Sequence, residues 1–217
     1  MFRIRDLLAV AALAVASVYA APAPAETIVD EWANIKVPAP PELKPVTLEP
    51  KTTAILVMDL VKQTCNSERR PRCVASIPKI EKLIAAARAQ GVVLIFTTVP
   101  PVPIADTLPA VAPKGNEPVV VAFVDKFTLG DKDTGFEKML KDKGITSVVA
   151  VGTAAHGAVL YTASAAALRG FNVIVPVDGM SGDGQIAYDE QAVAYILTHA
   201  PIVSPKITLT TIDMIKF

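Results

Sequence analysis

A continuous apolar run from Thr53 to Met58, followed at once by Asp59, constrains the fold more than any other feature of the sequence. A strand with one face in water alternates apolar and polar residues, and this run does not alternate. It is therefore typical of a strand that is buried on both faces, as in a parallel sheet. We predict such a strand here, with Asp59 directly after its carboxyl end.

Apolar runs and helical patterns alternate along the rest of the chain. The segment 76–90 has apolar residues at helical spacing, with Ser76 as a candidate cap, Pro78 in the first turn and Gly91 after the end. Six prolines between positions 99 and 118 predict a loop. We expect further strands over 92–97, 119–123, 147–151, 172–177 and 206–210, and further helices over 134–143, 156–169 and 188–199. This order predicts one doubly wound α/β domain over 51–217, with a mostly parallel sheet and helices on both of its faces.

In such sheets, binding and catalytic residues gather at the carboxyl ends of the strands. That rule selects four places in this sequence, namely Asp59, the loop near Lys126, the turn 152–158 and Asp178. We expect the functional site to be built from some of these residues.

The N-terminus is typical of an export signal. Arg3 and Arg5 precede a 14-residue apolar stretch from Leu7 to Ala20, which is short for a membrane span, and small residues follow. Residues 1–25 are therefore predicted to be a signal peptide, with an uncleaved membrane anchor as the alternative. Residues 26–50 are rich in proline and predict an extended arm. The mature protein is expected to be periplasmic or secreted, with no membrane contact after cleavage.

The charges of the chain balance, with 21 Lys and Arg against 21 Asp and Glu. A net charge of zero gives no reason to expect a nucleic acid as partner. The basic cluster at 68–72 is interpreted as a solvated loop. The remaining expectation for a partner is a small-molecule substrate.

Cys65 and Cys73 are the two cysteines of the chain. Export makes a disulfide between them plausible, because oxidising compartments let such bonds persist. A redox-active pair or a metal site is the alternative. A disulfide here would hold the loop that follows the first predicted strand.

Separated motifs, in order along the chain, resemble those of the isochorismatase-like superfamily, also called the cysteine hydrolases. The resemblance covers roughly 52–200 and rests on Ile55–Asp59, Asp125–Phe127, Val149–Ala163, the sequence Ala-Leu-Arg-Gly-Phe at 167–171, and Val175–Asp178. Family members often associate, so the resemblance also allows a homo-oligomer. The Ala-rich face of 163–167 is a candidate surface for packing against another helix.

The resemblance implies a catalytic set made of an Asp after the first strand, a Lys on a mid-chain loop and a Cys at the start of a helix. Asp59 and Lys126 match the first two, but Ala158 stands at the position of the cysteine. In the family, the Asp moves a proton and the Lys holds its charge. The N–H groups of Gly157 and Ala158 would stabilise negative charge on the substrate, and His156 would contact it or merely cap the helix.

The missing cysteine leaves two hypotheses. In one, the chain is a small-molecule hydrolase in which Asp59 is the general acid or base and Lys126 its partner. In the other, it is an inactive ligand-binding or interaction protein on the same fold. Related nicotinamidases bind a metal through histidines after the first strand, but 59–66 contain no His, so neither a metal nor a cofactor is expected.

Overall fold

The computed structural model describes residues 27–184 and 186–217, so the signal peptide predicted for 1–25 lies outside the described residues. Among the described residues, 27–37 belong to a separate unit. In it, the short helix α1 (Ile28–Glu31) begins after Thr27, whose N–H donates to the Asp30 carboxylate at 2.8 Å. Over the described ranges, no helix has both the length and the hydropathy that a membrane span needs.

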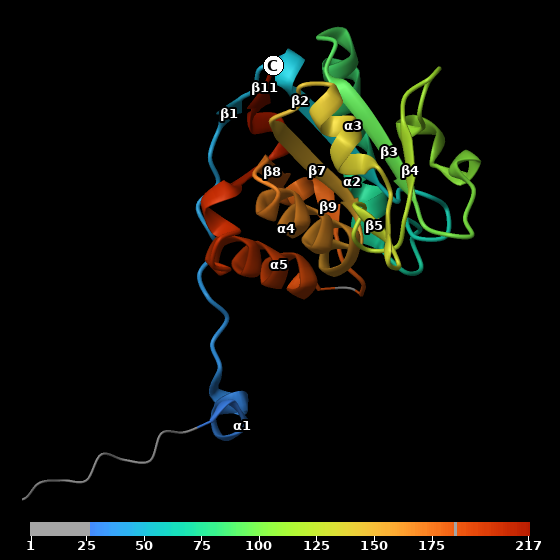
Figure 1. Cartoon of the computed structure of the whole chain (residues 1–217). Coiled ribbons are helices and arrows are strands. Elements are labelled where there is room, and N and C mark those ends of the chain that lie inside the picture. Colours follow the sequence, from blue (N-terminus) through green and yellow to red (C-terminus); the bar gives the residue numbers. More distant parts are fainter. Residues whose placement is uncertain (1–26, 185) are drawn as a thin grey trace, which may run out of the picture. The chain divides into compact units, whose positions relative to one another are not determined.

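The second unit, residues 38–217, is built around one seven-stranded sheet (Figure 1). Every strand pair in it is parallel. The strand order is β10 (Ile207–Thr210), β8 (Asn172–Pro176), β7 (Ser147–Thr153), β2 (Thr53–Met58), β3 (Val93–Thr98) and β4 (Val119–Val121), and β9 (Met180–Ser181) also pairs with β7. The predicted buried strand is β2, all of whose residues are buried.

Helices cover both faces of the sheet. The helix α2 (Pro71–Ala89) packs through Ile80, Leu83 and Ile84 on one face. The other face is covered by α3 (Phe136–Asp142), α4 (Leu160–Leu168) and α5 (Tyr188–His199). The predicted doubly wound α/β fold is therefore confirmed.

The order of the strands produces a topological switch point beside β2. The chain adds β3 and β4 on one side of β2 and then returns to add β7 on the other side. Such a reversal leaves an opening at the carboxyl ends of the two strands between which it occurs, here β2 and β7. Asp59 and the turn after β7 therefore flank the same opening.

Gly152 allows β7 to lie close to β2 at this opening. It pairs with Met58 and has a φ of 137°, which L side chains rarely adopt. A Cβ at this position would lie 2.0 Å from the Met58 carbonyl oxygen. Only glycine fits, and its presence brings the turn after β7 against the end of β2.

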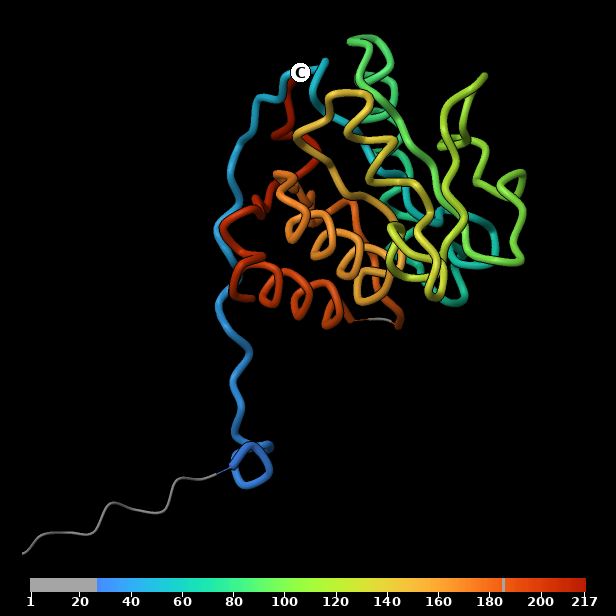
Figure 2. The backbone as a smooth tube through the Cα atoms, viewed as in Figure 1, coloured from blue at the N-terminus to red at the C-terminus, as the bar shows by residue number. Residues whose placement is uncertain are grey.

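Two small sheets complete the second unit. The strand β1 (Val46–Thr47) pairs in parallel with β11 (Ile215–Lys216), and Figure 2 shows residues 38–48 running beside the C-terminal part of the chain. The strands β5 (Thr128–Leu129) and β6 (Lys132–Asp133) form an antiparallel hairpin directly after Lys126. Part of the arm predicted for 26–50 is thus held to the domain by backbone pairing.

Two predicted helices begin elsewhere than expected. The helix predicted from 76 begins at Pro71, and Ser76 does not cap it but lies buried inside it, donating to the Cys73 carbonyl at 2.8 Å. Both Pro71 and Pro78 suit a first turn, and the sequence pattern alone favoured the wrong one. The helix predicted from 156 is regular only from Leu160, because Gly157 has non-helical dihedrals of −115° and −106°.

The Ala-rich face of 163–167 is not available to another subunit. Ala163, Ala166 and Ala167 are buried in the core of the chain itself, under the sheet and next to α5. Small side chains there let α4 approach its own neighbours closely. The prediction that this face packs against a helix of another subunit is therefore wrong.

Candidate active site

Asp59 lies at the carboxyl end of β2 and is only 3% exposed. Its backbone is in the left-handed region with a φ of 56°, which Asp tolerates better than most residues. The Thr64 hydroxyl donates to the Asp59 carbonyl oxygen, and the Thr97 hydroxyl, at the end of β3, donates to Oδ1 at 2.6 Å. The chain thus turns sharply at Asp59 and fixes its carboxylate at the opening.

Lys126 meets the other carboxylate oxygen of Asp59. Its side chain is fully buried, and its Nζ lies 2.7 Å from Asp59 Oδ2. The same Nζ donates to the carbonyl oxygens of Ala122 at 3.1 Å and Phe123 at 2.6 Å. An ammonium group has three hydrogens, and these three acceptors use all of them. The Lys126 ammonium group therefore has no hydrogen left for a further acceptor.

Burial acts against the charge of both partners. It raises the pKa of Asp59 above its ordinary value, more than the attraction of Lys126 and the hydrogen bonds from Lys126 and Thr97 lower it. It also lowers the pKa of Lys126, more than Asp59 raises it. Both shifts have burial as their main cause, and both bring the proton affinities of the two groups closer together.

Thr162, in α4, ties the loop of Lys126 to the helix that follows β7. Its hydroxyl accepts from the Lys126 N–H at 3.2 Å and donates to the Val124 carbonyl at 3.2 Å. No local sequence pattern predicts this role, because a threonine inside a helix has no distinctive pattern. The link sets the position of Lys126 relative to the turn 153–159.

The turn after β7 carries Gly157 and Ala158. Ala158 is 3% exposed. The Gly157 N–H donates to the Ala154 carbonyl at 3.1 Å, so in this structure it is engaged within the turn. A Cβ built on Gly157 would lie 3.7 Å from Val124, which places the turn against the loop that leads to Lys126. The oxyanion roles predicted for Gly157 and Ala158 stay predictions.

His156, in the same turn, is exposed and faces α5. Its Nδ1 lies 3.0 Å from the Asp189 carboxylate, in the first turn of that helix. The Asp189 carboxylate also accepts the N–H of Asp183 at 3.0 Å. His156 is therefore held at the rim of this region by Asp189, and its predicted contact with substrate stays a prediction.

Asp178 is another residue selected by the strand-end rule. Its carboxylate is held by contacts within the fold and not by residues of the candidate site. Its Oδ1 accepts the N–H of Ile212 at 2.8 Å, and its Oδ2 lies 2.7 Å from Lys79 Nζ. It follows β8, which is separated from β2 by β7. The contacts of Asp178 join α2 to the C-terminal part of the chain and involve neither Asp59 nor Lys126.

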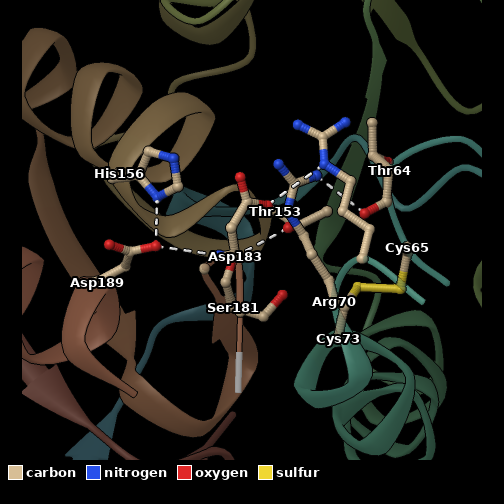
Figure 3. Close-up of polar contacts among 12 residues, drawn as sticks. Thr64, Cys65, Arg70, Cys73, Thr153, His156, Ser181, Asp183 and Asp189 are labelled. Atoms are coloured by element: carbon tan, nitrogen blue, oxygen red, sulfur yellow. Dashed lines mark hydrogen bonds and ion pairs between the residues drawn. A yellow bond between two sulfur atoms is a disulfide. The ribbon is translucent and has the colours of Figure 1, made fainter. Parts of the chain in front are cut away.

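The predicted disulfide is present, with the Cα atoms of Cys65 and Cys73 5.4 Å apart. The loop that it closes includes the basic cluster, and the interpretation of that cluster as a solvated loop is wrong. The side chain of Arg70 is 5% exposed and pairs with Asp183 (Figure 3). Arg72 makes a bidentate contact with Glu190, at 2.6 and 3.1 Å. Carboxylates more than 100 residues away in the sequence thus hold these arginines.

No group of three or more His, Cys, Asp and Glu side chains is arranged to hold a metal ion within the described ranges 27–184 and 186–217. The polar groups of the candidate site are the Asp59 carboxylate, the Lys126 ammonium group and the backbone N–H groups of the turn after β7.

Solved structures with this fold come from several bacteria and an archaeon. An isochorismatase family protein from Burkholderia thailandensis matches with a TM-score of 0.64 and 22% identity, over 79% of this chain and 97% of that one. A cysteine hydrolase from Pseudomonas syringae matches with a TM-score of 0.65 and 19% identity, over 80% and 94%. N-carbamoylsarcosine amidase from Thermoplasma acidophilum matches with a TM-score of 0.61 and 19% identity, over 75% and 97%. At these identities the likeness shows the fold.

No curated protein matches the chain. The family model of the Isochorismatase domain, however, matches residues 53–200, which run from the first residue of β2 to the end of α5. This range holds Asp59, Lys126 and the turn after β7, and it is more than half of the chain. The chain therefore belongs to the isochorismatase family of hydrolases.

Proposed function

We propose that this protein hydrolyses a small molecule without a cysteine nucleophile, with Asp59 as general acid or base and Lys126 as its charged partner. The observation that carries the proposal is the buried contact of 2.7 Å between Lys126 Nζ and Asp59 Oδ2. A buried charge pair is costly to maintain, and a pair at the carboxyl end of the central strands lies where α/β sheets place their chemistry.

Asp59 would act on a water molecule in this scheme. With an amide or an ester, the carboxylate takes a proton from water as the oxygen attacks the carbonyl carbon, and it then gives that proton to the leaving group. With a vinyl ether, a protonated Asp59 would donate first, and water would add to the resulting cation. In either case Lys126 keeps its charge and lowers the energy of the ionised carboxylate.

The turn after β7 would supply the groups that stabilise negative charge. The Ala158 N–H stands at the start of a helical turn, where backbone donors and the helix dipole favour an anion. Gly157 would contribute only if its bond to the Ala154 carbonyl opened. The methyl group of Ala158 cannot attack a substrate, and both cysteines of the chain are joined in a disulfide, so water is the nucleophile that remains.

Substrate has to reach a carboxylate that is 3% exposed. Side chains around Asp59 must therefore move on binding, as is common in sites that exclude water during the reaction.

A hydrolysis screen on amides, esters and vinyl ethers tests the proposal. The protein is assayed before and after treatment with iodoacetamide, which alkylates free thiols. We expect turnover of at least one compound, unchanged by the reagent, because the disulfide leaves no thiol to alkylate. Absence of turnover over a broad panel, or loss of turnover after alkylation, would contradict the proposal.

A further inference from the structure

We propose that Arg70 is the anion-binding residue of this active site, and that the substrate carries a carboxylate which takes the place that Asp183 holds in this structure. The inference rests on the proposed hydrolase function of Asp59 and names its substrate class. Four observations support it: the position of Arg70, its burial, its incomplete hydrogen bonding and the way in which Asp183 is held.

The position of Arg70 is tied to Asp59 through one residue. Arg70 Nη1 donates to the Thr64 carbonyl at 2.9 Å, and the Thr64 hydroxyl donates to the Asp59 carbonyl. The guanidinium also lies close enough to Asp59 for its charge to lower the pKa of that carboxyl, as one of several smaller effects beside burial and Lys126. A ligand group on Arg70 would therefore lie beside the proposed general base.

The charge of Arg70 is buried and only partly compensated. Its side chain is 5% exposed, and its one carboxylate partner, Asp183, is shared with Arg69. The two Nε atoms lie 2.6 Å and 3.4 Å from the same oxygen, Asp183 Oδ1. Arg72, the third arginine of the loop, has Glu190 as its own partner. Two guanidinium groups that share one carboxylate oxygen form a site that favours a further anion.

Hydrogen bonding at this contact is incomplete. Although Arg70 Nε is near Asp183 Oδ1, the N–H is not directed at the oxygen, and both atoms lack a hydrogen bond among the described residues. Ser181 Oγ, two residues before Asp183, is also buried without a partner in this part of the chain. Buried polar atoms are rarely left unpaired, so the Ser181 hydroxyl and the poorly directed ion pair of Arg70 and Asp183 leave hydrogen-bonding capacity for a polar ligand group. A carboxylate lying in the guanidinium plane would make two parallel hydrogen bonds, which Asp183 does not make here.

Asp183 is held so that its side chain can leave while its backbone stays. Its N–H donates to Asp189 Oδ2, and the Gly182 N–H donates to Glu190 Oε1 at 2.9 Å, so α5 anchors the segment. The Asp183 side chain, by contrast, is 43% exposed. Figure 3 shows it between Arg70 on one side and the pair of His156 and Asp189 on the other. A rotation of this side chain toward water would open Arg70 to a ligand without moving the loop.

Titration calorimetry with a matched pair of amides tests the inference. N-acetylglycine carries a carboxylate, and N-acetylglycinamide is its neutral counterpart. We expect the full-length protein to bind the charged compound about tenfold more tightly or better, because charge-assisted bonds to a buried guanidinium are strong. Arg70→Gln should abolish this preference. Arg88→Gln, which removes an arginine paired with Glu117 elsewhere on the fold, should keep it.

Asp183→Asn gives the result that a merely structural role would not produce. It removes the internal competitor while keeping the shape of the side chain, so the affinity for N-acetylglycine should rise about tenfold. Equal binding of the two compounds by the wild type, or a lower affinity in Asp183→Asn, would overturn the inference. If Arg70→Gln does not fold, the comparison of the two compounds in the wild type and the affinity measured for Asp183→Asn still test the inference.

Hydrolysis measurements separate this inference from the proposed function. The protein could bind N-acetylglycine through Arg70 and yet hydrolyse no compound of the panel. That result would support the anion site and contradict the proposed function. Alternatively, hydrolysis could depend on Asp59 but proceed at equal rates for charged and neutral substrates, and be unchanged in Arg70→Gln. That result would support the proposed function and overturn the anion site.

Discussion

Lys126 Nζ and Asp59 Oδ2 lie 2.7 Å apart in the interior of the protein, although the two residues are 67 positions apart in the chain. The backbone supplies two further acceptors to Lys126, and Thr97 supplies a further donor to Asp59. Every hydrogen of the Lys126 ammonium group and each oxygen of the Asp59 carboxylate thus has a partner, which is the condition under which buried charges persist.

Replacement of Lys126 should cost much stability. In Lys126→Met the carboxylate of Asp59 stays buried without its cation, and we expect the free energy of unfolding to fall by about 3–5 kcal/mol. Urea unfolding measures this loss. The double variant Lys126→Met, Asp59→Asn should recover part of it, because the uncompensated charge is then gone.

Lys79→Met is the matched control, since Lys79 also contacts an aspartate, Asp178, at 2.7 Å but at the surface. Water screens that pair, so a much smaller loss is expected. If Lys126→Met were as stable as Lys79→Met, the buried pair would not have the role described here.

The pH dependence of hydrolysis should report the raised pKa of Asp59. As a general base Asp59 must be deprotonated, so kcat/KM falls as the pH drops through its pKa. Because burial raises that pKa, the acidic limb should lie above the ordinary Asp value of 3.8. Thr97→Val removes a donor to the carboxylate and should move the limb to still higher pH.

Thr98→Val serves as control for this shift. Thr98 is the next residue of β3 and is also buried, but its hydroxyl donates to the Val102 carbonyl at 2.9 Å and not to Asp59. Its pH profile should match the wild type. A limb that moves equally in both variants would show that the Thr97 bond does not control the titration.

Gly152→Ala should destabilise the fold strongly. The new methyl group would lie 2.0 Å from the Met58 carbonyl oxygen at a φ of 137°, so we expect a loss of about 3 kcal/mol or more. Gly91→Ala has a φ of 71° but nothing within 4 Å of the added carbon, and it should lose only about 1–2 kcal/mol. Thermal and urea unfolding compare the two variants, and equal losses would refute the close approach of β7 to β2.

Reduction of the disulfide should lower the free energy of unfolding by about 2–3 kcal/mol, from the loss of a short cross-linked loop. Urea unfolding with and without a phosphine reductant measures the change. The double variant Cys65→Ser, Cys73→Ser should have the free energy of unfolding of the reduced wild type, and the reductant should not change it. An unchanged midpoint in the reduced wild type would mean that the 65–73 loop is held by its arginine contacts alone.

The sequence predicted those features that depend on local pattern. The apolar run of β2 and the helical spacing of α5 lie where they were expected, because burial on both faces and helix periodicity leave direct marks on neighbouring residues. Asp59 was predicted as a site residue from the same pattern, because it is the polar residue that directly follows the buried strand. Its pairing with Lys126 came from the resemblance to a family, since nothing local links the two.

The features that were missed depend on contacts between distant segments. Arg70 belongs to a basic cluster that is typical of a solvated loop, and only the fold brings it against Asp183, 113 positions later. Thr97 stands at the end of β3, so a stricter use of the strand-end rule would have included it. The start of α2 was misplaced because Pro71 and Pro78, seven residues apart, both fit a first turn.

The steady-state kcat/KM of Asp59→Asn on the best substrate of the screen tests the central claim most directly. The substitution keeps the size of the side chain and removes its ability to move a proton. We expect kcat/KM to fall by at least about a hundredfold, with an unchanged circular dichroism spectrum. Asp178→Asn, at the end of β8, should keep its activity, because its contacts are to Ile212 and Lys79 and not to Asp59 or Lys126. Wild-type kcat/KM in Asp59→Asn would contradict the account, because hydrolysis would then proceed without the carboxylate that Lys126 holds.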